Sequence, residues 1–320
     1  MKITRKSKFA PSTGSNLGIA LLAALLGWST AATPVRAADF EMETLEGAGI
    51  EHRGVWLVNA EARAFVALEP WPRLLRYLPR PGAEPMLKLG ERPHDTGIRT
   101  WFMEDDQQTR HAYRPAAQPA AIIERSDRSI LIRSRWTAEA GYETAVMMRI
   151  ELLDDGRLRI RHGVQNLADR PRRLAPWSIT AFPVGGVIDM VFHRPQVRTV
   201  ALFGDTTPDD LAKAMREDRL RIETEIMQTP DRALKFGILG KSGEISYRDQ
   251  AETWSSSVPY SEVGQYPDGG ANLTAFISNR RPDGGWSEIE QVGVEQLLGP
   301  FESAWLEETI SRSRDRIAAP

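Results

Sequence analysis

Short runs in which hydrophobic and polar residues alternate dominate the chain from Glu51 onward. In the clearest run, residues 157–166, one face carries apolar residues and His162, and the opposite face carries three arginines. The turn Asp154-Asp155-Gly156 joins this run to a β-rich run at 142–153. A period of two on either side of a tight turn predicts a hairpin with one buried and one wet face.

More than a dozen such strand candidates follow one another, and only one stretch has the pattern of a helix. There Thr207 is placed to cap the helix, Pro208 takes the first helical position, and residues 211–216 continue the helix. Many short strands with one short helix predict an all-β fold, a sandwich of large antiparallel sheets. Since no repeat or Gly/Ser linker interrupts the pattern, we expect a single domain over residues 38–320.

The first 37 residues have a different pattern. Four basic residues without an acidic one precede an apolar stretch at 17–28, and Val35-Arg36-Ala37 resembles a signal-peptidase cleavage site. This is the pattern of a secretory signal peptide, too short to span a bilayer comfortably, and it predicts a periplasmic or secreted protein. The alternative interpretation is an uncleaved membrane anchor.

Charge and composition narrow the range of partners. Without the five basic residues of that leader, 36 Lys and Arg face 43 Asp and Glu, a net charge of −7. A mildly acidic chain without a basic run argues against nucleic acid and anionic lipid as partners, and we expect no membrane contact after cleavage. The chain has no Cys, no nucleotide-binding fingerprint and no His spacing typical of a metal site, so no cofactor is expected.

The most informative segment lies at 286–292, after the turn Pro282-Asp283-Gly284-Gly285. Trp286, Glu288 and Glu290 stand at every second position, so in a strand both carboxylates leave the same face, about 7 Å apart. Two like charges in a dry core are costly. We therefore expect this face to meet water, a cation or a polar ligand, although ordinary exposed strand charges are the alternative.

Other residues suit the recognition of a sugar, which combines an aromatic face with a charged group for its hydroxyls. Trp101 stands beside Arg99, and Trp177 lies in a second apolar block. Tyr266 and Asp268 belong to an earlier Pro-Asp-Gly-Gly turn at 267–270. Each also has a structural interpretation: a core Trp, a solvated Arg or an ordinary turn residue.

Of the five His residues, His94 and His193 are weak catalytic candidates, and both also suit ordinary surface loops. His162 alternates with apolar residues, so we expect it to be a core residue with its hydrogen bonds satisfied. Glu262, just before the turn at 267–270, is a third weak candidate.

Several blocks, in this order, resemble the galactose-mutarotase-like superfamily, in particular a bacterial branch whose domain is of unknown function. The blocks are 97–102, 164–166 with 174–180, 235–238 with 245–247, 266–272, 288–290 and 298–303. Together they span nearly the whole chain after the leader. The resemblance implies a β-supersandwich of two large antiparallel sheets with a carbohydrate cleft on its concave side.

The departures from the family pattern concern catalysis. Aldose 1-epimerases use a His acid and a Glu base on opposite sides of the sugar, as general acid–base catalysis requires. Where the resemblance places the His, this chain has Pro176-Trp177, and Glu262 stands one residue away from the family's Glu. Phe301 also replaces a Gly of the last block.

Three interpretations remain open at this level. The first is an exported carbohydrate-binding protein around Arg99, Trp101, Trp177, Tyr266, Asp268, Glu288 and Glu290. The second is an enzyme, either a sugar epimerase with a relocated acid such as His94 or His193, or a hydrolase or lyase that uses the carboxylates. The third is a module of the cell envelope that binds another protein.

Overall fold

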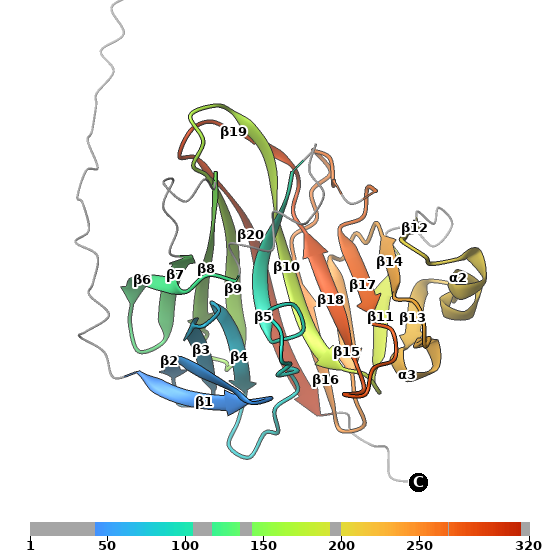
Figure 1. Ribbon diagram of the computed structural model, residues 1–320, viewed down its shortest axis with the longest axis horizontal. Coiled ribbons are helices and arrows are strands. Elements are labelled where there is room, and N and C mark those ends of the chain that lie inside the picture. Colours follow the sequence, from blue (N-terminus) through green and yellow to red (C-terminus); the bar gives the residue numbers. More distant parts are fainter. Residues whose placement is uncertain (1–41, 105–116, 135–142, 193–199, 268, 315–320) are drawn as a thin grey trace, which may run out of the picture. The chain divides into compact units, whose positions relative to one another are not determined.

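The structure, a computed structural model, describes residues 42–104, 117–134, 143–192, 200–267 and 269–314 (Figure 1). These residues belong to one compact unit, Pro34–Pro320. The predicted signal peptide and its boundary at residue 37 lie outside the described residues. Within the described residues, no helix has the length and apolar character needed to cross a membrane.

Two large antiparallel sheets make up the fold, which confirms the predicted class (Figure 1). The larger sheet has eleven strands, and β19 pairs with β10 beside its main path. In spatial order its strands are β1 (Glu43–Gly47), β2 (Ile50–Val58), β3 (Arg63–Glu69), β4 (Arg73–Leu78), β5 (Ile98–Glu104), β10 (Arg172–Pro183), β18 (Trp286–Val292), β17 (Leu273–Ile277), β14 (Leu234–Ile238) and β12 (Val200–Phe203), with β19 (Gln296–Leu298).

The smaller sheet has nine strands. Their spatial order is β13 (Arg219–Glu223), β11 (Val187–Val191), β15 (Glu244–Arg248), β16 (Glu252–Ser257), β20 (Ser303–Arg314), β9 (Leu158–Asn166), β8 (Thr144–Leu152), β7 (Ser129–Ser134) and β6 (Ala120–Arg125). The predicted hairpin is the pair β8–β9, and Gly156 adopts the positive φ of 80° that its turn requires.

The predicted helix is α2 (Pro208–Ala214), and Thr207 caps it as expected, in a capping box with Asp210. A four-residue helix, α3 (Thr224–Met227), follows β13. Strand β13 ends at Glu223, and the chain leaves the sheet at Thr224. The Thr224 hydroxyl donates a hydrogen bond to the Gly186 carbonyl and accepts one from the Gly185 N–H, which fixes this departure.

The core lies between the two sheets. The Phe182 ring of the larger sheet stacks on Tyr247 of the smaller sheet at 4.2 Å between centroids, and contacts Trp254 edge-on at 5.5 Å. Inward-facing aliphatic residues of both sheets complete one continuous cluster. This core fixes which residues of each strand face inward, and therefore which residues stand on the outer faces where a ligand has access.

One polar network crosses the core. His162 is fully buried; its Nδ1 lies 2.8 Å from Thr100 Oγ1 and its Nε2 lies 2.8 Å from Glu308 Oε2. Ser178 and Ser256 donate hydrogen bonds to the same carboxylate. The expectation that His162 is a satisfied core residue is therefore confirmed, and Glu308 is the partner that satisfies it.

Candidate functional site

The strand with two carboxylates, β18, lies near the middle of the larger sheet, between β10 and β17. Ile289 points into the core, and Gln291 Oε1 lies 2.8 Å from the Ser256 hydroxyl oxygen of the smaller sheet. Because side chains alternate along a strand, Trp286, Glu288 and Glu290 stand on the outer face of the larger sheet. The predicted common face of the two carboxylates is therefore present.

Glu288 is held by neighbours on that face. Arg99 Nη2 donates to Glu288 Oε1 at 2.7 Å, and Trp286 Nε1 donates to the same oxygen at 2.9 Å. Burial raises the pKa of Glu288; the Arg99 guanidinium opposes this rise, and the negative charge of Glu290 reinforces it. The net shift favours the neutral acid.

Glu290 has a second set of partners. Thr274 Oγ1 donates to Glu290 Oε2 at 2.9 Å, and Lys235 Nζ lies 3.1 Å from the same oxygen. The Lys235 ammonium also lies over two aromatic rings, 4.7 Å from the centroid of Trp177 and 5.1 Å from that of Phe203. This pairs a cation with both a carboxylate and aromatic faces.

The face of the two carboxylates was expected to meet water, a cation or a polar ligand, and among the described residues it meets two cations. Glu288 and Glu290 are 6% and 2% exposed. The cations that compensate them are the side chains of Arg99 and Lys235, which neighbouring strands of the sheet supply. A buried pair of like charges is tolerated here because each carboxylate has its own cation, the buried Arg99 and the partly buried Lys235.

The two predicted Trp residues flank this group. Trp101 and Trp177 are directly opposite each other in the β5–β10 ladder, and their rings meet edge-on at 5.3 Å between centroids. The Arg99 guanidinium lies 5.0 Å from the Trp101 ring centroid. Sequence reasoning therefore named residues that the fold brings together, although Trp177 is only 3% exposed. We call Arg99, Trp101, Trp177, Lys235, Trp286, Glu288 and Glu290 the outer cluster.

His94 reaches the edge of the outer cluster, with its ring centroid 5.3 Å from that of Trp286. Burial lowers the pKa of His94, nearby Asp95 opposes the shift, and Arg99, Arg92 and Arg281 add to it. The imidazole is therefore neutral at neutral pH. His193 and Asp268 lie outside the described residues.

Glu262 and Tyr266 line a separate hollow of about 450 Å³ in the loop that precedes β17. The rings of Tyr260 and Tyr266 lie nearly parallel, with centroids 6.1 Å apart, and the Ser261 N–H donates to the Tyr266 hydroxyl at 2.9 Å. Burial raises the pKa of that phenol, and the Ser261 hydrogen bond opposes it. No residue of the outer cluster lines this hollow, so the predicted residues fall into two groups.

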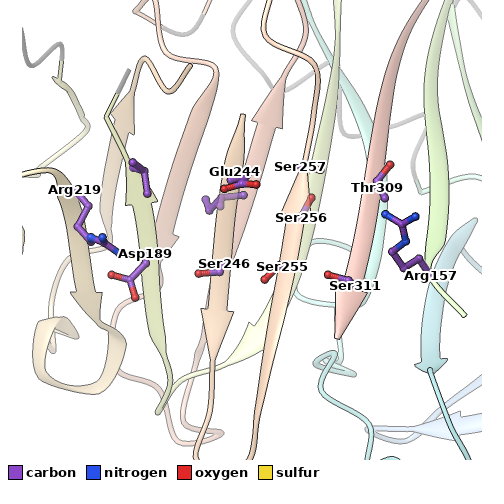
Figure 2. A pocket seen from close by; sticks show the side chains of 12 residues that line it. Arg157, Asp189, Arg219, Glu244, Ser246, Ser255, Ser256, Ser257, Thr309 and Ser311 are labelled. Atoms are coloured by element: carbon purple, nitrogen blue, oxygen red, sulfur yellow. The ribbon is translucent and has the colours of Figure 1, made fainter. Parts of the chain in front are cut away.

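Another hollow, which sequence reasoning missed, occupies the outer face of the smaller sheet, with a volume of about 430 Å³ (Figure 2). Its floor is a row of hydroxyls, because Ser255 is directly opposite Ser246 on one side and Ser311 on the other. Arg157 and Arg219 stand at opposite sides, and each already pairs with an Asp, at 2.7 and 2.8 Å. None of the described residues that line this hollow is aromatic.

Apart from Trp286, which was noted only for its alternation with the two carboxylates, Lys235 is the member of the outer cluster that sequence reasoning did not select. It is the single charged residue of the apolar strand β14, and this isolation is the signal that could have marked it. In the described parts of the chain, no group of three or more His, Asp or Glu side chains is placed to hold a metal ion.

Comparisons with solved structures agree with this architecture. A galactose mutarotase-like protein from Lactobacillus casei is 12% identical, with 81% of this chain and 100% of that chain covered and a TM-score of 0.59. A galactose mutarotase related enzyme from Lactobacillus acidophilus is 11% identical, covering 81% and 97%, with a TM-score of 0.56. A GalM/aldose epimerase homologue from C. elegans is 10% identical, covering 82% and 98%, with a TM-score of 0.55.

No protein-family model and no curated protein sequence matches the chain. The similarity to the solved structures nevertheless shows that the chain has the fold of the galactose mutarotase-like, aldose 1-epimerase-type proteins, as its sequence blocks suggested. At such low identity the similarity establishes the architecture, and the chemistry has to be argued from this chain's own residues.

Proposed function

We propose that this chain is an exported protein that binds carbohydrate on the outer face of its larger sheet without transforming it. The observation that carries the proposal is the outer cluster, in which three Trp side chains share one sheet face with Arg99, Lys235 and two carboxylates. Aromatic faces accept the C–H side of a pyranose, and charged groups hold its hydroxyls. The mutarotase-like fold supports the same class of ligand.

The placement of the carboxylates argues for binding rather than hydrolysis. An inverting hydrolase needs two carboxyl groups on opposite sides of the scissile bond, about 6.5–9.5 Å apart. Glu288 and Glu290 leave the same face of one strand, and each is held by its own cation. This arrangement supports a role of the two carboxylates in orienting a ligand and the residues around it.

Binding can be measured by calorimetric titration with D-galactose, D-glucose, the corresponding uronates and their short oligosaccharides. Trp101→Ala removes an aromatic face of the outer cluster, and we expect its affinity to fall at least about tenfold. Trp305→Ala is the matched control, because Trp305 also lies under a guanidinium, that of Arg161 at 4.9 Å, but on the smaller sheet. The absence of binding by the unmodified protein to all of these sugars would refute the proposal.

A second candidate function, sugar epimerisation, is favoured by one specific observation. The neutral His94 and Glu288, whose pKa is raised, both contact Trp286. An imidazole and a carboxyl whose pKa is raised are groups that general acid–base catalysis can use as base and acid. Polarimetry of freshly dissolved galactose and glucose tests this function, and a rate equal to that of buffer excludes it.

Export is a further part of the proposal, supported by the basic and apolar pattern of residues 1–37. We expect expression of the full chain in a bacterium to give a periplasmic product whose N-terminus is Ala38. A cytoplasmic product that retains Met1–Ala37 would contradict it.

A further inference from the structure

The outer cluster contains buried hydrogen-bond donors for which the described residues supply no acceptor. Arg99 is 1% exposed and uses Nη2 for Glu288, but its Nε and Nη1 make no hydrogen bond to any described residue. Trp177 is 3% exposed, and its Nε1 also makes no hydrogen bond to any described residue. Buried polar groups normally have partners, so these N–H groups indicate a missing acceptor.

The fold brings these donors together. Arg99 is directly opposite Ile179 in the β5–β10 ladder, and Trp101 is directly opposite Trp177. Arg99 and Trp177 are therefore diagonal neighbours on one face, with backbones about 7–8 Å apart. Their side chains both contact the Trp101 ring, Arg99 at 5.0 Å and Trp177 at 5.3 Å.

All the unpaired atoms are of one kind. Guanidinium and indole nitrogens donate hydrogen bonds and accept none. A buried guanidinium that lacks part of its hydrogen bonding is costly, and a group with acceptor oxygens and a negative charge relieves this cost best. Lys235, 4.7 Å from the Trp177 ring centroid, adds positive charge beside the same place.

We propose that the ligand is an acidic sugar, a uronate, whose carboxylate accepts hydrogen bonds from the unpaired N–H groups of Arg99 and Trp177. The sugar ring then lies against the Trp101 ring. This inference rests on the proposed carbohydrate binding and narrows it to one chemical class.

The two carboxylates of β18 are compatible with an anionic ligand. Glu290 is compensated by Lys235 and by the Thr274 hydroxyl. Burial raises the pKa of Glu288, Arg99 opposes this, and Glu290 adds to the rise, so the carboxyl shifts toward its neutral form. Repulsion of a carboxylate ligand is therefore weaker than the two formal charges suggest.

The experiment is a calorimetric comparison of D-galacturonate and D-glucuronate with D-galactose and D-glucose on the full chain at pH 7. We expect each uronate to bind at least about tenfold more tightly than its neutral counterpart, because a hydrogen bond to a charged group contributes about 1.5–3 kcal/mol. Acetate, which has the carboxylate without the ring, is expected to bind at least about tenfold more weakly than the uronates.

Arg99→Lys is the diagnostic variant, because it keeps the positive charge beside Glu288 and removes the Nε and Nη1 donors. It should abolish the preference for uronates, whereas Arg161→Lys, a change of the guanidinium over Trp305 on the other sheet, should leave it unchanged. Trp177→Phe keeps an aromatic ring without its N–H and should reduce the preference. It serves as the test if circular dichroism shows that Arg99→Lys is unfolded.

The outcomes separate the two proposals. Equal affinities for uronates and neutral hexoses, or a preference that survives Arg99→Lys, overturn the acidic-sugar inference and leave carbohydrate binding standing. Acetate that binds as tightly as the uronates also overturns the inference, because the site then recognises an anion without its ring. If none of the four sugars binds, the proposed function itself fails.

Discussion

Two buried carboxylates of this protein stand in contrasting surroundings. Glu308, between the sheets, accepts hydrogen bonds from His162, Ser178 and Ser256, in a network closed on every side by the core. Glu288, on the outer face, is held by Arg99 and Trp286, while two further N–H groups of that same Arg99 remain without a partner among the described residues. A closed network is typical of a structural role, whereas leftover donors indicate a place for a ligand.

The pKa values of Glu308 and Glu288 shift in opposite directions, in line with their different surroundings. Burial raises the pKa of Glu308, but the hydrogen bond and attraction of His162, with the hydroxyls of Ser256 and Ser178, outweigh it and leave the pKa below its ordinary value of 4.5. For Glu288 burial prevails over the attraction of Arg99, and its pKa lies above 4.5. The protein therefore stabilises the charge of the inner group and disfavours that of the outer one.

The largest expected effect is on the inner network. Glu308→Ala leaves the His162 imidazole and two buried hydroxyls without their acceptor, and we expect it to lower the free energy of unfolding by about 3–5 kcal/mol. Chemical denaturation measures this change. Glu307→Ala is the control, because its side chain is 48% exposed on the opposite face of β20, and it should cost less than about 0.5 kcal/mol. Similar losses for both variants would contradict a structural role of the network.

The next effect separates two Trp residues of the outer cluster. Trp286→Phe and Trp177→Phe both replace a buried indole with a smaller phenyl ring, but only the Trp286 indole donates a hydrogen bond to a carboxylate, that of Glu288. We expect Trp286→Phe to lower the free energy of unfolding by about 0.5–1.5 kcal/mol more than Trp177→Phe, the usual net contribution of a hydrogen bond. Equal losses by chemical denaturation would show that the Trp177 N–H has a partner after all.

The pH dependence of stability gives the third, smaller effect. The lowered pKa of Glu308 contributes stability above its unfolded pKa, near 4.5, that is lost as pH falls through the folded value. The raised pKa of Glu288 has the opposite sign, so its contribution is highest below 4.5 and is lost as pH rises toward the folded value.

The free energy of unfolding of the unmodified protein, minus that of Glu308→Gln or of Glu288→Gln, can be measured by denaturation from pH 3 to 8. Plotted against pH, the two differences should therefore slope in opposite directions. Each unit of pKa shift corresponds to about 1.4 kcal/mol. Parallel difference curves would contradict the contrast between the two groups.

The fold could be predicted from the sequence because its signals are local. The turn at 154–156 and the alternation on either side of it specify the β8–β9 hairpin. Four consecutive residues, 207–210, specify the N-terminal cap of α2. The common face of Trp286, Glu288 and Glu290 also follows from alternation alone. His162 could be predicted as a core residue because the side chains next to it on its face of β9 are apolar.

The partners of the carboxylates could not be predicted in this way. Arg99 and Glu288 are 189 positions apart, and they meet only because β10 lies between β5 and β18 in the sheet. Lys235 reaches Glu290 across β17 for the same reason. Strand order and register are set by the packing of the whole core, which no single segment encodes. Without them the two carboxylates had no identified partner, and water, a cation or a polar ligand was expected on their face.

The most direct test of the outer cluster as a ligand site is a titration that follows the indole N–H resonances of the nine Trp residues by NMR. D-galactose and then D-galacturonate are added to protein labelled with ¹⁵N. We predict that the resonances of Trp101 and Trp177 move. The resonance of Trp254 should stay in place, because its N–H, like that of Trp177, has no partner among the described residues but lies in the core. Movement of the Trp305 resonance alone, on the smaller sheet, or of none of the nine, would contradict the account.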